Sequence, residues 1–438
     1  MPRLLNVLYL ALVVLLSPWL LYSAVRKGKY RAGLAQKWLG HAPERASQRQ
    51  CAWLHAVSVG EVNLLAPLLK VLEAQHPDWD FVISTTSAAG YALASKKYAE
   101  RTVFYCPLDF SWAVNRALKR VRPDVLILAE LELWPNLLHA AHREGVAVAV
   151  FNGRLSERSF RGYRRLGPFV KRVLANVDLI AAQNETYAER FRALGATNVH
   201  VAGNLKFDGA ETDRNNPRTR KLAALAGIDA DDVILLAGST QAPEEELALA
   251  TFQQLAPTHP QLRLLLVPRH PERFAEVAAL LERSGVAWDR RSKLENRHAD
   301  PTARVLLVDV VGELGAWWGA AQIGFVGGSL LNRRGGQNMI EPAAYGAAVC
   351  FGPNTSNFRD VVRLLREQDA AVVVSSAAEL TAFVERCLCE PAFAEQLGAR
   401  ARALVQQQHG ATQETARLLA PLFQPPAQIL SLPARRVA

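Results

Sequence analysis

The chain contains only five cysteines in 438 residues, and their arrangement excludes two common architectures. Their number is odd, and the one close pair, Cys387 and Cys389, is a Cys-x-Cys on an expected helix. This pattern matches neither a disulfide framework nor the ligand spacing of a zinc site. We therefore expect a reducing compartment, with the cysteines acting as small buried apolar side chains. The sequence also has no cluster of metal ligands, and we expect no metal or other cofactor.

Two further absences narrow the function. No block of lysine and arginine is interleaved with aromatic residues, so nucleic acid is the weakest explanation for the net charge of +10. An anionic membrane surface and an acidic substrate remain as explanations. No Gly-x-Gly-x-x-Gly follows the first expected strand, which disfavours a dinucleotide-dependent dehydrogenase. We expect no nucleic-acid partner.

An almost wholly apolar stretch occupies residues 4–22. At about 1.5 Å rise per residue, a helix of this length nearly spans a bilayer core of about 30 Å. Positive residues gather after it, at Arg26, Lys27, Lys29 and Arg31, which places the following chain in the cytoplasm. A cleaved signal peptide is the alternative, but the charge lies on the wrong side for one. We predict a single uncleaved membrane anchor, and we expect the chain without residues 1–25 to fold and to retain turnover.

After the anchor the chain alternates short β-rich runs with amphipathic helices. Strands are predicted at residues 52–57, 81–84, 103–106, 125–129, 146–151, 179–182 and 199–202, then at 233–237, 264–267, 305–308, 323–326, 349–351 and 371–374. This alternation is typical of parallel sheets covered by helices on both faces. We predict an α/β fold of two doubly wound domains facing a cleft. The expected division is an anchor and basic flank (1–30), a first domain (31–210), a linker (211–220), a second domain (221–424) and a disordered tail (425–438).

Several acidic and basic residues follow predicted strands of the first domain. Glu61 follows a strand and Gly60, where a carboxylate serves either as a general base or simply as a favourable charge in a first helical turn. Glu130 and Glu132 end another strand, a costly place for acids without a role or a partner. Asn152 either positions a substrate or bonds a neighbouring loop. Lys206 and Asp208 form either a cleft site or a surface pair.

In the second domain, four strand ends carry polar loops. They contain residues 238–240, Pro268 with Arg269, residues 309–314, and the glycine-rich stretch 325–346. Since ligands of such sheets bind beyond the carboxyl ends of the strands, these loops are expected to form one site. In the last loop, Asn338 and Glu341 have the spacing of a capping box, which predicts a helix N-terminus suited to a phosphate. Glu341 would then bond ribose hydroxyls beside it.

Taken together, the motifs resemble the 3-deoxy-D-manno-octulosonic acid (Kdo) transferases of lipopolysaccharide synthesis. The residues that carry the likeness are 58–61, 130–136, 152–156, 203–208, 267–272, 312–314, 327–329 and 335–342. The resemblance covers both domains and includes the basic N-terminal anchor. It implies a GT-B glycosyltransferase fold, the donor CMP-Kdo and, as acceptor, the phosphorylated disaccharide precursor of lipid A (lipid IVA). It also implies an inner-membrane location with the catalytic domains on the cytoplasmic side.

The resemblance implies roles for individual residues. Glu61 is similar to the family's proton acceptor, and Glu130 and Lys206 to its transition-state stabilisers. The implied CMP site consists of Pro268, Arg269, Val311, Gly312, Glu313, Gly335, Gly336, Gln337, Asn338 and Glu341. One residue departs from the family pattern: histidine is usual where Gln337 stands, and an amide can hydrogen-bond but cannot carry charge. Two alternatives stay open, a membrane-associated GT-B enzyme using a UDP-sugar and a nucleotide-sugar binding protein without turnover.

Overall fold

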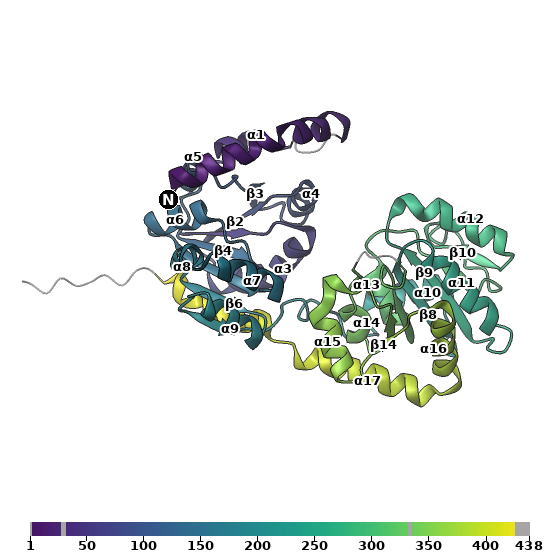
Figure 1. Cartoon of the computed structure of the whole chain (residues 1–438). Coiled ribbons are helices and arrows are strands. Elements are labelled where there is room, and N and C mark those ends of the chain that lie inside the picture. Colours follow the sequence, from purple (N-terminus) through teal and green to yellow (C-terminus); the bar gives the residue numbers. More distant parts are fainter. Residues whose placement is uncertain (1, 28–31, 332–334, 425–438) are drawn as a thin grey trace, which may run out of the picture. The chain divides into compact units, whose positions relative to one another are not determined.

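The computed structural model describes residues 2–27, 32–331 and 335–424. The chain divides into two compact units, Met1–Gly209 with His409–Ala438, and Ala210–Gln408. Each unit is built on a seven-stranded sheet, and every neighbouring pair of strands in both sheets is parallel (Figure 1). The predictions of a disordered tail and of a basic flank at Lys29 and Arg31 concern residues outside the described ranges.

The first sheet has the strand order β3-β2-β1-β4-β5-β6-β7. Its strands are β1 (Cys51–His55), β2 (Asp80–Thr85), β3 (Thr102–Tyr105), β4 (Val125–Ala129), β5 (Ala147–Gly153), β6 (Leu179–Ala182) and β7 (Val199–Val201). The chain builds outward from β1 to β3 and then returns to the other side of β1 with β4. The point between β1 and β4 is therefore a topological switch point, where ligands of open α/β sheets bind.

Helices cover both faces of this sheet (Figure 1). They are α2 (Leu34–Leu39), α3 (Val59–Gln75), α4 (Ala88–Lys97), α5 (Ser111–Val121), α6 (Pro135–Arg143), α7 (Glu157–Arg165), α8 (Gly167–Leu174) and α9 (Glu185–Ala193). Successive residues of β1, Trp53 and Leu54, are fully buried and belong to two different core clusters. Because side chains alternate between the faces of a strand, both faces are buried, which explains the continuous apolar runs in the sequence.

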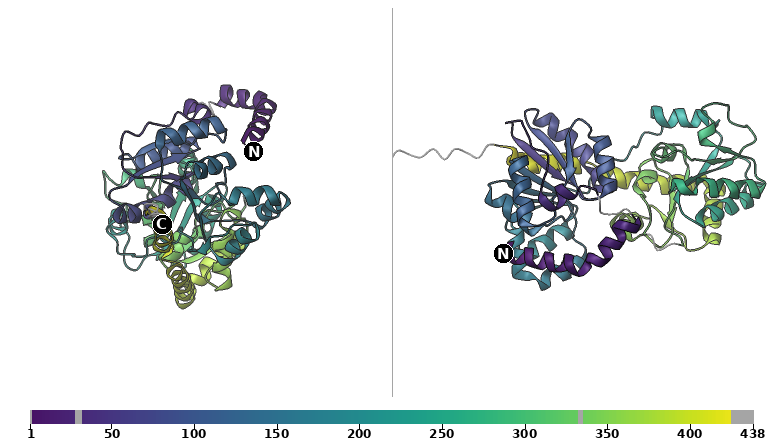
Figure 2. Two further views of the ribbon diagram at one scale, coloured as in Figure 1. Left: turned by 90° about the vertical axis from the view of Figure 1, so that its left-hand side faces the viewer. Right: turned by 90° about the horizontal axis from the view of Figure 1, so that it is seen from above.

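The end of the described chain returns to the first unit, which corrects the predicted second domain of 221–424. Helix α18 (Ala411–Leu419) and the 3₁₀ turn η5 (Ala420–Phe423) pack on the first sheet, as the yellow segment beside the blue and teal strands shows (Figures 1 and 2). Phe423 stacks on His76 with ring centroids 4.3 Å apart. Asp208 accepts hydrogen bonds from the backbone N–H groups of Gly410 (2.8 Å) and Thr412 (2.5 Å). Asp208 thus caps α18 from a position two hundred residues away.

The second sheet has the strand order β10-β11-β9-β8-β12-β13-β14. Its strands are β8 (Val233–Thr240), β9 (Leu262–Pro268), β10 (Trp288–Arg290), β11 (Val305–Leu307), β12 (Ile323–Val326), β13 (Ala348–Phe351) and β14 (Val372–Val373). Strand β10 was not predicted, because it is a three-residue edge strand that contains only one apolar residue. The chain builds from β8 to one side of the sheet and then returns to the other side of β8 with β12, so the switch point lies between β8 and β12.

The helical segments of the second unit vary in length from three to 17 residues. They are α10 (Pro217–Leu225), α11 (Glu244–Leu255), η1 (Pro271–Arg273), α12 (Phe274–Ser284), η2 (Arg291–Lys293), α13 (Leu314–Trp317), η3 (Trp318–Ala320), α14 (Ile340–Ala344), η4 (Ser356–Phe358), α15 (Arg359–Glu367), α16 (Ala377–Cys389) and α17 (Pro391–Gln407). The predicted linker 211–220 is attached to this unit: Arg214 donates to the carbonyls of Tyr345 (2.7 Å), Gly319 (3.1 Å) and Ala321 (2.8 Å).

The apolar N-terminus forms one helix, α1 (Pro2–Lys27), on the outside of the first unit (Figures 1 and 2). Among the described residues, Pro2–Trp19 is the one helical segment long and apolar enough to cross a membrane, with a mean hydropathy of 1.5 and none of its length buried. Leu4, Val7 and Leu8 expose 74%, 64% and 62% of their surface. Such a face is consistent with an anchor, although a signal sequence has the same composition.

Candidate functional site

The switch point of the first sheet gathers the acidic residues predicted from the sequence. Strands β1 and β4 are direct neighbours, with His55 opposite Leu128, so the segments that follow them leave the sheet side by side. Glu61 lies in the first turn of α3, and Glu130 directly follows β4. We call residues 130–134, between β4 and α6, the acid loop.

Glu61 closes a capping box at the start of α3. The Ser58 hydroxyl accepts a hydrogen bond from the Glu61 backbone N–H (3.3 Å). In return, the Glu61 carboxylate accepts from the Val57 N–H (2.8 Å) and the Ser58 hydroxyl (2.7 Å). Burial raises the pKa of the Glu61 carboxyl, while these hydrogen bonds lower it. A carboxylate oxygen has two lone pairs, so each oxygen keeps one acceptor site beyond the cap.

Glu130 and Lys206 form an ion pair beside Glu61. The Lys206 Nζ lies 3.4 Å from Oε1 of Glu130, and the two side chains are 28% and 23% exposed. Both charges act on Glu61, since the negative charge of Glu130 raises its pKa and the positive charge of Lys206 lowers it. The structure therefore brings together Glu61, Glu130 and Lys206, the three residues to which the family resemblance assigns catalysis.

The backbone around this cluster is held in a strained conformation. Glu130 and Asn152 have φ angles of 55° and 52°, in the left-handed region that is uncommon for residues other than glycine. The Glu130 N–H donates to the Phe151 carbonyl (2.9 Å), and the Asn152 side chain accepts from the Leu205 N–H (3.1 Å). Asn152 thus bonds a neighbouring loop, the second of the two roles proposed for it, and places Lys206.

Glu132, the second carboxylate of the acid loop, has a different environment. Its Oε2 accepts a hydrogen bond from the Trp134 indole (2.9 Å). Burial and the negative charges of Glu61 and Glu130 raise the pKa of Glu132 to about 7. Among the described residues, Glu130 forms an ion pair with Lys206 and Glu132 forms none, so Glu130 is the carboxylate of this loop that has a charged partner.

In the second unit, Arg269, Asn338 and Glu341 form the centre of the predicted nucleotide site. Arg269 follows Pro268 at the end of β9, is exposed, and its N–H donates to the Thr240 carbonyl (3.0 Å). Burial raises the pKa of Glu341, while the hydrogen bond from Asn338 Nδ2 (3.0 Å) and the positive charge of Arg269 lower it. Polar groups from two separate loops therefore meet around one carboxylate.

The helix after Asn338 is shorter than the predicted one. Helix α14 begins at Ile340 and has five residues, and Asn338 Oδ1 accepts from the Ile340 N–H (3.1 Å). The predicted capping box is wrong in its details, because Glu341 bonds the side chain of Asn338 instead of its backbone. A five-residue helix supplies little dipole, so a phosphate bound here would depend mainly on side chains and loop N–H groups.

Gly335 and Gly336 adopt φ angles of 87° and 74°, which favour glycine. A Cβ on Gly335 would lie 2.5 Å from Ser356 Oγ, so this position also has no room for a side chain. Gln337 is partly buried, and its Nε2 would lie 3.3 Å from a Cβ on Gly328. These contacts fold the glycine pair and Gln337 back on the loop after β12.

The loop containing Val311, Gly312 and Glu313 is only partly available to a ligand. Val311 is 74% exposed, and Gly312 has a φ of 88°. The Glu313 carboxylate, however, forms a two-pronged ion pair with the buried Arg291, at 2.9 Å from Nε and 2.7 Å from Nη2. Its side chain is thus engaged within the protein, and the loop would contact a ligand through Val311 and the backbone.

A buried carboxylate that the sequence reasoning missed holds the loop after β12. Glu244 is fully buried and accepts hydrogen bonds from the N–H groups of Gln241 (3.0 Å), Gly328 (2.7 Å), Ser329 (3.0 Å) and Leu330 (3.0 Å). The loop at residues 328–330 therefore points its N–H groups at Glu244. The available signal was three consecutive acids at the start of α11, separated from the end of β8 by three residues.

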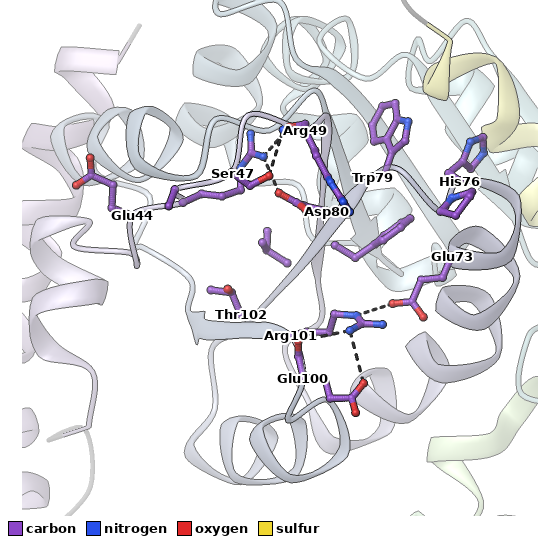
Figure 3. Close-up of a pocket in the computed structure, with 15 residues that line it drawn as sticks. Glu44, Ser47, Arg49, Glu73, His76, Trp79, Asp80, Glu100, Arg101 and Thr102 are labelled. Carbon is purple, nitrogen blue, oxygen red and sulfur yellow. Dashed lines mark hydrogen bonds and ion pairs between the residues drawn. The ribbon is translucent and has the colours of Figure 1, made fainter.

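A pocket of about 620 Å³ lies elsewhere, at the amino-terminal ends of β2 and β3 (Figure 3). Two ion pairs line it, with Arg45 2.8 Å from Asp80 and Arg101 2.6 Å from Glu73. It contains none of the predicted site residues. Since catalytic groups of such sheets lie at the opposite, carboxyl ends, this pocket is not part of the candidate site.

Comparison with known proteins decides the family. A family model for 3-deoxy-D-manno-octulosonic-acid transferase (kdotransferase) matches residues 30–209. A 3-deoxy-D-manno-octulosonic acid transferase of Haemophilus influenzae is 32% identical over 425 residues, which cover 95% of this chain and 98% of that protein. The chain belongs to the Kdo transferase family. A Kdo transferase of Bordetella pertussis is 35% identical over 409 residues, covering 91% of this chain and 94% of the relative.

The fold of this Kdo transferase family member has solved counterparts. A glycosyltransferase from Rickettsia africae aligns with a TM-score of 0.57 at 11% identity, covering 87% of this chain and all of that one. Identity this low speaks for the fold alone, which is the GT-B fold predicted from the sequence.

Proposed function

We propose that the chain transfers Kdo from CMP-Kdo to a hydroxyl of the phosphorylated disaccharide precursor of lipid A, lipid IVA, and releases CMP. Membership of the Kdo transferase family supports the donor and the acceptor. The catalytic assignment rests on the cluster at the switch point of the first sheet. There, the ion pair of Glu130 and Lys206 acts on the pKa of Glu61 with charges of opposite sign. We assign acceptor activation to the first unit and CMP binding to the second.

The proposed reaction is a single displacement with inversion. The Glu61 carboxylate accepts the proton of the attacking acceptor hydroxyl, the new bond forms from that oxygen to the anomeric carbon of Kdo, and the bond to the CMP phosphate breaks. A base must be unprotonated before the reaction and strong enough to accept the proton, and burial of Glu61 raises its pKa toward the working pH. The ion pair of Glu130 and Lys206 then stabilises the charge that develops beside it.

The phosphate of CMP gains charge as it leaves. Arg269 is exposed beside Glu341, and its guanidinium can form charge-assisted hydrogen bonds to the phosphate of CMP. Glu341, held by Asn338, is placed to accept hydrogen bonds from ribose hydroxyls. Gly335 and Gly336 have no side chains, so their backbone can approach the nucleotide closely.

The location is also a proposal. The exposed apolar side chains of α1 support attachment to a membrane, and the net charge of +10 suits both an anionic leaflet and the phosphates of the acceptor. We propose an inner-membrane enzyme whose catalytic units lie on the cytoplasmic side.

The purified full-length protein, CMP-Kdo and lipid IVA in detergent would test this function. Mass spectrometry of the lipid should show an added Kdo mass, with matching release of CMP. Release of UDP from a UDP-sugar in place of CMP would support the rival glycosyltransferase. Tight CMP binding without release under any acceptor would support a binding protein.

A further inference from the structure

Helix α1 has two polar side chains on the face that contacts the first unit. Asn6 and Tyr9 are partly buried there, whereas the neighbouring Val7 and Leu8 are 64% and 62% exposed. Residues three apart share a helix face, so Asn6 and Tyr9 point the same way. Membrane attachment alone does not require Asn6, because an apolar side chain would serve it better, whereas a tyrosine such as Tyr9 also suits a membrane interface.

Asn6 caps another helix. The residue before α5 is Phe110, which has no side-chain acceptor for the first N–H groups of that helix. Asn6 Oδ1 accepts from the Ser111 N–H (3.0 Å), and Asn6 Nδ2 donates to the Ser111 hydroxyl (2.7 Å). The same Oδ1 also accepts from Nδ2 of the buried Asn136 (3.3 Å). Asn6 thus supplies the cap that α5 lacks and reaches the start of α6.

Tyr9 acts through a buried carboxylate. Its hydroxyl donates to Oδ2 of Asp109 (2.9 Å), and its ring packs edge-on against Phe110 at 5.9 Å. Asp109 is 5% exposed and accepts from the N–H groups of Asn136 (3.0 Å) and Leu137 (2.9 Å). Burial raises the pKa of Asp109 to about 6, while the hydrogen bonds from these three residues lower it and so favour the carboxylate.

These contacts end at the acid loop. Helix α6 starts at Pro135 after Trp134, which has no side-chain cap of its own, so Asp109 provides the cap. Trp134 is the last residue of the acid loop, and its indole donates to Glu132 (2.9 Å). The two residues of α1 are therefore connected through Asp109 and Asn136 to the segment that presents Glu132 and Glu130.

We propose that Asn6 and Tyr9 are positioning residues for catalysis, and that α1 docks on the first unit to hold the acid loop in place. The inference rests on the proposed role of the acid loop and adds a second task to the N-terminal helix. It also revises the expectation that a chain without residues 1–25 retains full turnover.

The test uses the full-length protein in detergent, with Tyr9→Phe and Asn6→Ala. Tyr9→Phe keeps the ring contact with Phe110 and removes one hydrogen bond to a carboxylate, so it should not impair folding. Loss of such a bond corresponds to roughly a tenfold change in a local equilibrium. Amide hydrogen exchange in residues 130–137, measured by mass spectrometry, should accelerate about tenfold. The kcat for Kdo transfer should fall about 3- to 10-fold, with the KM for CMP-Kdo unchanged, because the nucleotide residues are in the other unit.

Leu8→Ala is the matched control, because Leu8 lies on the exposed side of the same helix. It should weaken binding to anionic phospholipid vesicles and leave exchange and kcat in detergent at parental values. Parental exchange in residues 130–137 for both Asn6→Ala and Tyr9→Phe would overturn the inference, as would a lower kcat without faster exchange. The exchange result does not depend on catalysis. A failure of the proposed acid-loop chemistry would appear separately, as parental turnover in Glu130→Gln.

Discussion

Replacing Glu61 by glutamine separates the two roles that the structure allows this residue. Glu61 is a capping residue, with hydrogen bonds from Val57 N–H and the Ser58 hydroxyl. It is also the proposed base. The change preserves the shape of the side chain and removes the group that can accept the proton.

The cost to stability follows from the cap. The amide oxygen of glutamine can still accept from Val57, and the amide nitrogen can donate to the Ser58 oxygen. One exchanged hydrogen bond and the lost charge at the helix start together cost about 1–2 kcal/mol. For a unit of this size that lowers Tm by only a few degrees. Loss of a general base, in contrast, lowers the rate by roughly 10²–10⁴, which is about 2.7–5.5 kcal/mol of activation free energy.

The assay is single-turnover transfer from CMP-Kdo, measured beside Tm and CMP affinity. Turnover of Glu61→Gln should fall by at least a hundredfold with CMP affinity unchanged. A rate within a few-fold of the parent, in a variant with the expected small drop in Tm, would refute the assignment of Glu61 as the base.

Ser58→Ala is the control for this prediction. It disrupts the same cap but retains the carboxylate, so the loss of stability should be similar. The Ser58 hydrogen bond lowers the pKa of Glu61, and its removal should raise that pKa. Since the base works only when unprotonated, the acidic limb of the pH–rate profile should move to higher pH. At pH values above the limb, the rate of Ser58→Ala should return close to that of the parent.

Three further changes test the second unit. Arg269→Ala should weaken CMP binding by about 1.5–3 kcal/mol in a calorimetric titration, because a charge-assisted bond to phosphate is lost, and unchanged affinity would remove Arg269 from the site. Glu341→Gln should weaken CMP binding less, since an amide oxygen still accepts from a ribose hydroxyl; a loss larger than that of Arg269→Ala would contradict this role. Glu244→Gln should destabilise the protein by about 2–5 kcal/mol in urea unfolding, because an amide cannot accept all four N–H groups now bonded to the carboxylate. As a control, Glu246→Gln changes an exposed residue of the same helix and should leave the free energy of unfolding unchanged. Equal effects of the two changes would contradict the proposed stabilising role of the buried Glu244.

The sequence predicted the architecture because buried parallel strands are continuous apolar runs. Thirteen runs were located, and the one strand missed, β10, has a single apolar residue and lies at the edge of its sheet. The destination of α18 could not be predicted in the same way. The pattern of its apolar residues predicts that one face of the helix is buried, but it does not indicate which sheet that face packs on. Two contacts decide this: Asp208 caps the start of α18, and His76 stacks on Phe423 of the following turn η5. Both residues lie more than two hundred positions earlier in the chain.

The positions of candidate residues at strand ends were predictable from the sequence, as at Glu61, Glu130 and Arg269, and their roles stay predictions. The hydrogen-bond and ion-pair partners of these side chains could not be predicted from the sequence. Glu313 looks like a ligand in the sequence, but its carboxylate is paired with the buried Arg291, from a loop twenty-two residues earlier. Glu244 looks like an ordinary acid at a helix start, but it satisfies three N–H groups of a loop more than eighty residues later.

The residues with strained backbone conformations show why a local sequence pattern cannot predict such long-range partners. Three residues other than glycine have φ angles in the left-handed region at the carboxyl ends of strands: Glu130 (55°), Asn152 (52°) and Ser239 (54°). Glu130 follows β4, Asn152 lies near the end of the adjacent strand β5, and Ser239 lies near the end of β8. A conformation that costs of order 1–3 kcal/mol persists only where the surrounding structure compensates for it. At Asn152, the compensation comes from a hydrogen bond to Leu205 and from Gln183, whose side chain donates to the Asn152 carbonyl. Three strands contribute to that one backbone conformation, so it becomes visible only once the sheet has brought their ends together.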